Sequence, residues 1–482
     1  MNTRAVAHLI SFMLMVIALA MLGCAGVAVL SGDPPAAVRA LVISAGLVFG
    51  VGAALSRGTR GPLELSRRDG FGIVAFGWVA AAVAGALPYL LAGVIRQPVA
   101  ALFESMSGLT TTGASVLTDL EALPRGILFW RALTHFFGGM GVLIMCVAIL
   151  PFLGVGGMQI YRAEMPGPSK DRLAPRITTT AKLLWGVYVA LIAAQTGLLM
   201  LGGLSLFDAL CHAFATLATG GFSTRTASLG AFNSVYIEVV TILFMFLAGV
   251  NFSLHYRALS GQVRAYFRDP EFRFYCGIWL VSGLVLSASV WRTVYPGWGQ
   301  ALRSGFFQGT SILTTTGFAT ADFDAWPAAS RLLLVLLMFI GGCAGSTGGG
   351  IKHLRLLVVI KMVLGEIMLF MRPQAVVRVK VGGRVLPPGA AANIGAFFTL
   401  FLLLFALNTL LMTFYTPDLA TAASSVIAAM GNIGPGLAAV GPTQTYAAIP
   451  DPGQLILTFC MLLGRLEIYT VLIVLLPGFW KK

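Results

Sequence analysis

Charged residues are scarce in this 482-residue chain: Asp, Glu, Lys and Arg make up 10% of it, whereas they make up about 25% of a typical soluble domain. Hydrophobic residues make up 57%. This composition excludes a soluble globular enzyme, which needs a charged surface, and a disordered chain, which has few apolar residues. A transmembrane helix needs about 20 apolar residues, so about ten such helices and their connections would account for the whole chain. We therefore expect an all-α integral membrane protein that is not an enzyme.

Cysteine is also scarce, and no two cysteines have the spacing of a metal site or a redox motif. The six residues are Cys24, Cys146, Cys211, Cys276, Cys343 and Cys460, each in an apolar stretch. We expect buried thiols that neither bind metal nor form disulfides.

Acidic residues are fewer than basic ones, 18 against 32, which leaves a net charge of +14. Most basic residues lie near the two termini and in the segments 57–69, 162–182, 257–273 and 352–384. Nucleic-acid binding is therefore not expected, because alternate loops of a membrane protein carry this pattern on their cytoplasmic side. We expect a multi-pass protein in contact with membrane lipid, with both termini and these segments in the cytoplasm.

The N-terminus permits two interpretations. Leu22-Gly23-Cys24 faintly resembles a lipoprotein cleavage site. Residues 5–32 contain no Asp, Glu, Lys or Arg and are long enough to cross a bilayer. We favour a first helix that is retained over a cleaved signal.

After a helical hairpin at 1–56, a unit of about 100 residues recurs four times. Each unit contains an apolar helix, a short segment that ends in a Gly-rich loop, and a second apolar helix. We expect repeats at 70–152, 178–259, 273–363 and 390–478, and a broken second helix in the third. The loops are Thr110–Ser115, Ala218–Ser223, Thr314–Ala319 and Gly431–Gly436.

These loops predict a cation pore. Non-helical backbone inside a bilayer must be buried in protein or line water, so we expect the four loops to surround one pseudo-fourfold axis. Glycine permits backbone angles that turn successive carbonyls inward. Rings of carbonyl oxygens can replace the hydration shell of an alkali cation.

The short segments before the loops carry acids. Glu104, Asp208 and Asp418 are each expected near the start of a short helix, where a carboxylate stabilises the N-terminus. The third repeat departs from this pattern, with Arg303 and Gln308 in the corresponding region.

The segment 341–350 is unusual because six of its ten residues are glycine. A phosphate-binding loop is excluded, since Ile351 and not lysine follows Gly350. Two interpretations stay open: a mobile loop inside the membrane, or a helix that crosses its neighbours closely through glycine faces.

Arg465 lies near the middle of the last apolar stretch, 453–477. A charge at that depth predicts a functional role, either as a positive barrier in a pore or as part of a structural ion pair. Glu467 is two residues away, on another helix face, and is not expected to be its partner.

The remaining polar residues carry weaker signals. Arg131, His135 and His212 are interpreted as interhelical hydrogen-bonding residues and not as metal ligands or acid–base groups, since no His-x-x-x-His motif or carboxylate pair accompanies them. Lys352 and Arg355 are expected at the cytoplasmic face.

The loop motifs, together with Gly464-Arg465-Leu466-Glu467-Ile468-Tyr469, resemble the TrkH subunit of the Trk/Ktr/HKT superfamily of potassium transporters. The resemblance covers nearly the whole chain, including the extra N-terminal hairpin. It implies four helix–pore loop–helix repeats around a pseudo-fourfold pore, a homodimer in the bacterial inner membrane, and a cytosolic TrkA-type nucleotide-binding regulatory subunit.

The resemblance also implies which residues act. Carbonyls that bind potassium would be those of Thr110, Thr111, Thr112 and Gly113; Ala218, Thr219, Gly220 and Gly221; Thr314, Thr315, Thr316 and Gly317; and Gly431, Asn432, Ile433 and Gly434. The gate would consist of Gly345, Ser346, Thr347, Gly348, Gly349, Gly350 and Arg465. No organic cofactor is expected.

In the family that this sequence resembles, members with serine in place of the first filter glycine tend to favour or admit sodium. That position is Gly113 in this sequence. Potassium selectivity is therefore expected, although Asn432-Ile433 in place of Thr-Thr makes the ring less regular. A sodium or weakly selective pathway remains the alternative. An intramembrane enzyme would need a catalytic dyad at helical spacing, which the sequence lacks, and a receptor or scaffold would not explain four repeated loops.

Overall fold

The computed structural model describes residues 1–59, 61, 66–148, 173–387 and 389–480. The expected end of the first repeat, 149–152, and the basic positions 162–172 lie outside these residues. Within the described residues, the chain is helical apart from short loops and one pair of two-residue strands. Six helices are long and apolar enough to cross a membrane, and two bent pairs bring the number to eight. The expectation of an all-α integral membrane protein is confirmed.

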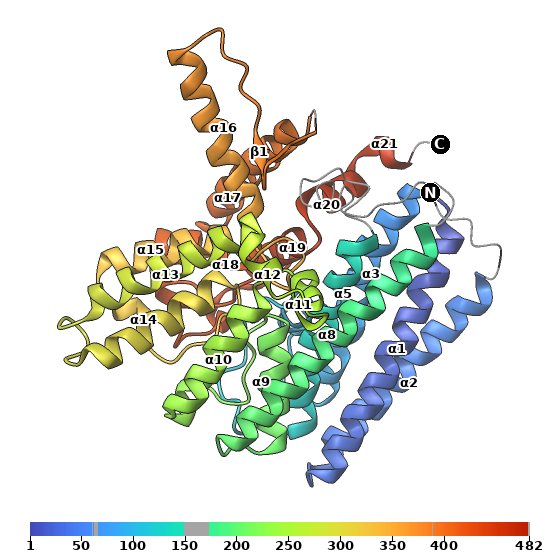
Figure 1. Ribbon diagram of the computed structural model, residues 1–482. Coiled ribbons are helices and arrows are strands. Elements are labelled where there is room, and N and C mark those ends of the chain that lie inside the picture. The colour runs from blue at the N-terminus through green and yellow to red at the C-terminus, as the bar shows by residue number, and fades with distance from the viewer. Residues whose placement is uncertain (60, 62–65, 149–172, 388, 481–482) are drawn as a thin grey trace.

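The N-terminal hairpin consists of α1 (Thr3–Leu30) and α2 (Pro35–Gly58), which lie side by side at one edge of the molecule (Figure 1). Asp33 in the turn between them accepts hydrogen bonds from the backbone nitrogens of Arg125 (3.0 Å) and Gly126 (2.7 Å). These nitrogens belong to the first turn of a later helix and have no partner within it, so the carboxylate caps that helix. The hairpin is thereby joined to the first repeat.

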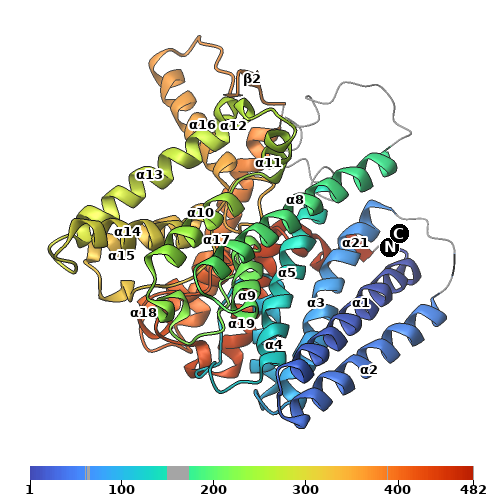
Figure 2. The same ribbon diagram turned by 60° about the horizontal axis from the view of Figure 1, so that its bottom comes forward.

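A pattern of long helix, short helix and second helix then recurs four times along the chain. Figures 1 and 2 show where these helices lie. The four sets are α3 (Arg67–Leu91), α4 (Pro98–Leu109) and α5 (Arg125–Ala148); α8 (Leu173–Leu201), α9 (Leu206–Leu217) and α10 (Val235–Ala248); α13 (Pro270–Val290), α14 (Trp298–Leu313) and α15 (Ala328–Ile340); and α17 (Ala390–Met412), α18 (Leu419–Met430) and α19 (Asp451–Arg465). Each short helix stops at the first residue of a Gly-rich loop.

Three of the second helices are interrupted. The third repeat breaks after α15 and resumes as α16 (His353–Met371), as expected from its glycines. In the second repeat the chain bends by 102° between α10 and α11 (Phe252–Leu259), and in the fourth by 115° between α19 and α20 (Ile468–Leu475). These two breaks were not predicted, because in each case the residues on both sides of the break form one apolar stretch.

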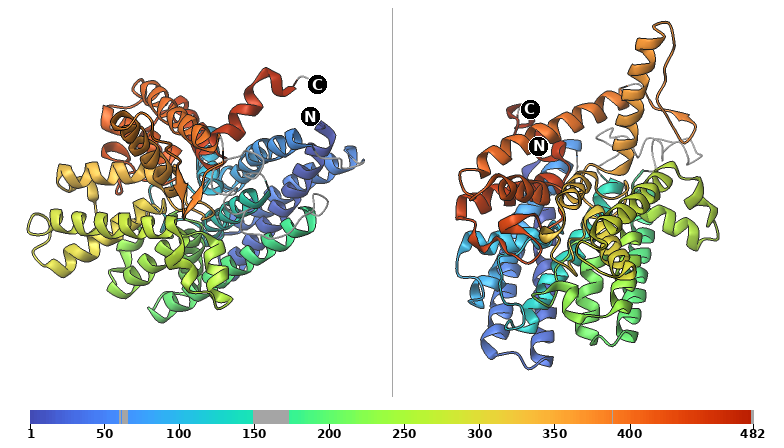
Figure 3. Two further views of the ribbon diagram at one scale, coloured as in Figure 1. Left: turned by 45° about the horizontal axis from the view of Figure 1, so that its top comes forward. Right: turned by 90° about the vertical axis from the view of Figure 1, so that its left-hand side faces the viewer.

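Both termini lie at the same end of the molecule, and α16 projects from that end (Figure 3). The strands β1 (Lys380–Val381) and β2 (Arg384–Val385) form an antiparallel pair after α16. The short helices α12 (Arg264–Arg268) and α21 (Pro477–Trp480) complete the α-helices of the described chain. It also contains the 3₁₀ helices η1 (Ser228–Phe232), η2 (Phe323–Ala325), η3 (Ala438–Val440) and η4 (Tyr446–Ala448). The common position of the termini agrees with an even number of membrane crossings.

Candidate functional site

The four Gly-rich loops share one unusual backbone conformation. The second residue of each has a positive φ, from +52° to +60°, at Thr111, Thr219, Thr315 and Asn432. The fourth residue, a glycine, also has a positive φ, from +78° to +100°. The first and third residues do not, so residues of negative and positive φ alternate. This alternation turns each peptide plane so that successive carbonyls face the same side of the chain.

The fourth-position glycines bring the loops together in a closed ring. A Cβ added to Gly113, Gly221 or Gly317 would clash with a carbonyl oxygen of the next loop, at Gly220, Thr316 and Ile433 respectively, and a Cβ on Gly434 would lie 2.7 Å from the carbonyl oxygen of Thr112. The contacts therefore run from the first loop to the second, third and fourth, and from the fourth back to the first. Glycine is required at these positions both for its positive φ and for the close approach of the neighbouring backbone.

The third-position carbonyls form a set of buried acceptors. Those of Thr112, Gly220, Thr316 and Ile433 accept no hydrogen bond from any residue that the structure describes. Buried backbone carbonyls nearly always have a partner. Four such oxygens, each next to the adjoining loop of a closed ring, suit a cation that would accept their lone pairs.

The loops differ in the side-chain contacts that hold their backbones in place. In the first loop the hydroxyls of Thr110 and Thr112 are 2.8 Å apart, and in the third those of Thr314 and Thr316 are also 2.8 Å apart. The first threonine of each pair donates to a carbonyl one helical turn earlier, at 2.7 Å. These two loops are therefore braced by their own side chains.

The second loop is braced by an aromatic ring from another helix. A Cβ added to Gly220 would lie 2.5 Å from Nδ1 of His135, which stacks on Phe222 with ring centroids 4.2 Å apart. Neither ring nitrogen of His135 has a hydrogen-bond partner among the described residues. The interpretation of His135 as a hydrogen-bonding residue is therefore wrong: it supports the loop by packing.

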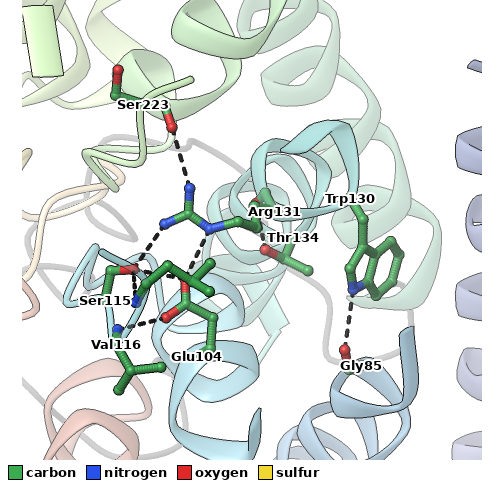
Figure 4. Close-up of polar contacts among 9 residues, drawn as sticks. Gly85, Glu104, Ser115, Val116, Trp130, Arg131, Thr134 and Ser223 are labelled. Carbon is green, nitrogen blue, oxygen red and sulfur yellow. Dashed lines mark hydrogen bonds and ion pairs between the residues drawn. The ribbon is translucent and has the colours of Figure 1, made fainter. Parts of the chain in front are cut away.

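A buried ion pair joins the first and second loops on their outer side (Figure 4). Arg131 of α5 pairs with Glu104 of α4, with 2.8 Å between Nε and Oε1, and the two side chains are 2% and 0% exposed. Arg131 also donates to the Ser115 hydroxyl and the Ser223 carbonyl, both at 3.2 Å. Glu104 accepts from the Val116 backbone nitrogen at 3.0 Å. Arg131 is thus an interhelical hydrogen-bonding residue, as predicted, but its pairing with Glu104 was not foreseen.

Other repeats use uncharged side chains at the position of Glu104. In the second repeat His212 lies 2.9 Å from the hydroxyl of Ser223, as its interpretation as a hydrogen-bonding residue predicted. In the third, Gln308, with its amide oriented to satisfy both groups, accepts from the backbone nitrogen of Thr320 at 2.9 Å. The short helix thus reaches the outer end of its own loop in each of these three repeats.

The expected acids at the helix starts are only partly present. Asp208 lies in the first turn of α9, and Asp418 is the N-cap of α18, where it accepts from the Thr421 nitrogen at 2.8 Å. Glu104 instead lies in the middle of α4, where it serves Arg131 and the loop. Sequence proximity alone had grouped residues that are not structurally equivalent.

Residues 341–352 are non-helical and lie against the inner end of the ring. The backbone nitrogen of Gly349 donates to the Thr315 hydroxyl at 2.7 Å, and the Thr347 hydroxyl donates to the Leu217 carbonyl at 2.8 Å. A Cβ added to Gly349 would clash with the carbonyl of Gly431. This segment therefore contacts the third and fourth loops and the last residue of α9, just before the second loop. It is a loop and not a helix crossing, and its mobility stays a prediction. Its role as a gate stays a prediction.

Arg465 ends α19 and is 4% exposed. Its guanidinium donates to the carbonyl of Thr347 at 2.7 Å and to that of Gly138, on α5, at 3.0 Å. Arg465 thus binds the 341–352 segment directly and ties it to the first repeat. These bonds to carbonyls do not test either interpretation, so the positive barrier and the structural ion pair both stay predictions.

The expectation for one nearby residue is corrected. Arg355 is 5% exposed and pairs with Glu467 at 2.7 Å, so it does not lie at the cytoplasmic surface. Glu467 is accordingly not the partner of Arg465, as predicted. Lys352 turns back and donates its Nζ to the carbonyl of Gly348. The ion pair between Arg355 and Glu467 therefore joins α16, the helix after the segment, to the break in the fourth repeat.

Side-chain metal ligands are not gathered at this site. Within the described ranges, no group of three or more His, Cys, Asp or Glu side chains could hold a metal ion. A cation at the ring would therefore be bound by backbone carbonyls and threonine hydroxyls. These neutral oxygen ligands suit an alkali ion better than a transition metal.

Comparisons with known proteins agree with this geometry. Residues 44–480 match the TrkH family, described as a cation transport protein. The chain is 41% identical to the Trk system potassium uptake protein TrkH of Halomonas elongata, over 100% of both chains, and 42% identical to that of Escherichia coli K12, over 87% of each. The crystal structure of the potassium transporter TrkH from Vibrio parahaemolyticus superposes with a TM-score of 0.92 and 38% identity, over 100% of both chains.

Proposed function

This chain belongs to the TrkH family of cation transport proteins, and from that premise we propose that it takes up potassium ions across the bacterial inner membrane through the ring of four loops. The observation that carries the proposal is the closed ring itself, in which each glycine abuts a carbonyl of the next loop. Its relatives are named potassium uptake proteins. The ion would move inward down its electrochemical gradient, either alone or with a proton.

The ligands in this proposal are carbonyls of Thr110–Gly113, Ala218–Gly221, Thr314–Gly317 and Gly431–Gly434. Glycine at all four fourth positions favours potassium, because no side chain narrows or redirects the ring. The irregular fourth loop, with Asn432 and Ile433, favours the second candidate, a sodium or weakly selective pathway of the same fold.

The gate in this proposal is the 341–350 loop, in particular Gly345–Gly350, together with Arg465. The loop contacts the third and fourth filter loops and the end of α9, and the guanidinium donates to its Thr347 carbonyl. A fixed positive charge in a medium of low dielectric constant repels a cation more strongly than it would in water. Movement of the segment would displace this barrier and open the path.

The remaining proposals concern assembly. We keep the repeat limits proposed from the sequence: 70–152, 178–259, 273–363 and 390–478. We also propose that the chain forms a homodimer, has both termini in the cytoplasm and binds a cytosolic TrkA-type regulatory subunit. The support is the basic charge of segments such as 352–384, which exceeds what membrane orientation requires. Anionic lipid is the other partner that such charge attracts.

The decisive experiment is ion flux in proteoliposomes that contain the purified chain, with potassium, rubidium, sodium and lithium compared under the same gradient. Potassium and rubidium flux well above sodium and lithium flux is the expected result. Equal flux of potassium and sodium would replace the proposal by the weakly selective alternative, and no flux with or without a regulatory partner would refute transport by this chain.

A further inference from the structure

The fourth loop lacks the internal brace of the first and third. Its first and third residues are Gly431 and Ile433, so no hydroxyl pair can form there. Asn432, at the second position, is held from outside: its Nδ2 donates to the Thr112 hydroxyl and to the Met461 carbonyl, both at 3.0 Å. These bonds restrain the inner half of the loop and leave the outer half, at Gly434, to another group.

That group is Tyr446, which lies between the fourth loop and α19. Its hydroxyl donates to the carbonyl of Gly434 at 2.6 Å. Its backbone nitrogen donates to the carbonyl of Ser115 at 2.9 Å, and its ring packs on Phe103, with centroids 5.4 Å apart. The residue is 3% exposed. One buried side chain therefore connects the outer end of the fourth loop to the outer end of the first.

Gly434 is the exception among the four glycines. The carbonyls of Gly113, Gly221 and Gly317 accept no hydrogen bond from other described residues. Because a carbonyl oxygen has two lone pairs, the Gly434 oxygen can accept from Tyr446 and still face an ion. The bond restrains this oxygen in position without removing it from the ring.

We propose that Tyr446 is a positioning residue for ion selectivity, which braces the fourth loop from outside and prevents its Gly434 carbonyl from closing around an ion smaller than potassium. The inference rests on the proposed function, since it assigns a role within that ring. A flexible filter discriminates by how strongly its carbonyls can approach the ion. Sodium is the smaller ion, so the carbonyls must move inward to bind it. The fourth loop has no internal threonine bonds and resists this movement through the contacts that Asn432 and Tyr446 make.

The test is Tyr446→Phe, which removes one hydroxyl and keeps the ring against Phe103. The matched control is Tyr275→Phe: the Tyr275 hydroxyl, on α13, donates at 3.0 Å to the carbonyl of Phe246 on α10, and not to one of the four loops. Both variants are purified, reconstituted and compared with wild type for potassium and sodium permeability and for thermal unfolding. The permeability ratio is a readout that a purely structural role would not change.

We expect Tyr446→Phe to lower the potassium-to-sodium permeability ratio several-fold while potassium flux is retained, and Tyr275→Phe to leave the ratio within two-fold of wild type. An unchanged ratio in a folded Tyr446→Phe variant would overturn the inference. If that variant does not fold, 3,5-difluorotyrosine at position 446 keeps the shape and makes the hydroxyl a stronger donor; a ratio unaltered by this change would also overturn it. A wild-type protein without potassium preference would instead refute the proposed function, which keeps the two failures distinct.

Discussion

Replacing Arg131 by methionine tests whether the ion pair behind the first loop holds the ring together. The substitution keeps most of the aliphatic volume but leaves the Glu104 carboxylate buried and without its cation, although Ser115 and Val116 still donate to it. Removing one partner of a buried ion pair costs about 3–5 kcal/mol, because an uncompensated charge stays behind. The side chains are 2% and 0% exposed, so solvent cannot screen that charge.

The third repeat suggests how the loss can be recovered. Gln308 occupies the position of Glu104 there and satisfies backbone nitrogens of its loop with a neutral amide. We therefore expect the double variant Glu104→Gln/Arg131→Met to lose less stability than the sum of the two single variants. The difference should be about 1–3 kcal/mol, the range found for residues in direct contact. The double variant should also transport potassium, since the amide can still bind the first loop.

The free energy of unfolding can be measured by SDS titration in mixed micelles for the wild type, both single variants and the double variant. Arg264→Met, at an exposed position, is the control and should change stability by less than about 0.5 kcal/mol. If the stability loss of the double variant equals the sum of the two single losses within about 0.5 kcal/mol, the two residues are energetically independent. That result would refute the expected coupling between Glu104 and Arg131.

Three further predictions concern the ring and the segment below it. Gly113→Ser should raise sodium permeability relative to potassium, because the new Cβ clashes with the Gly220 carbonyl and an L-residue in the left-handed region costs about 1–2 kcal/mol; an unchanged flux ratio in a folded variant would contradict this. Gly349→Ala should displace the 341–352 segment, because its Cβ meets the Gly431 carbonyl, and should raise flux measured without a regulatory partner; flux equal to wild type would count against the gate. Arg465→Ala should raise potassium flux by removing the positive barrier, with thermal unfolding recorded on the same preparation; a stable variant with wild-type flux and regulation would exclude Arg465 from gating.

Local sequence was sufficient for the features that depend on composition and short motifs. The paucity of charge and the long apolar stretches predict membrane helices, because the bilayer requires apolar side chains and internally satisfied backbone. The four loops could be found because their glycines meet a requirement that no other residue meets, a positive φ next to a neighbouring carbonyl. The glycines at 341–350 likewise indicated an interruption there, although a helix packed through its glycine faces stayed open.

Features that depend on residues far apart in the chain could not be found in this way. Nothing near Arg131 indicates that Glu104, 27 residues earlier, lies within hydrogen-bonding distance. The break at Glu467, where φ is +63°, occurs inside an apolar stretch, and its carboxylate pairs with Arg355 of another repeat.

The residues with positive φ show the same division between local and tertiary causes. Thr111, Thr219 and Thr315 are β-branched and disfavour the left-handed region when considered alone. They adopt it because the closed ring of four loops determines the path of each backbone. The sequence by itself thus determined that the chain crosses a membrane and carries four loops suited to a cation. Only the tertiary structure decided which carbonyls adjoin which loop and which side chains hold them there. Those contacts join segments about 100 residues apart, and 320 apart where the fourth loop meets the first, which the packing of the repeats brings together.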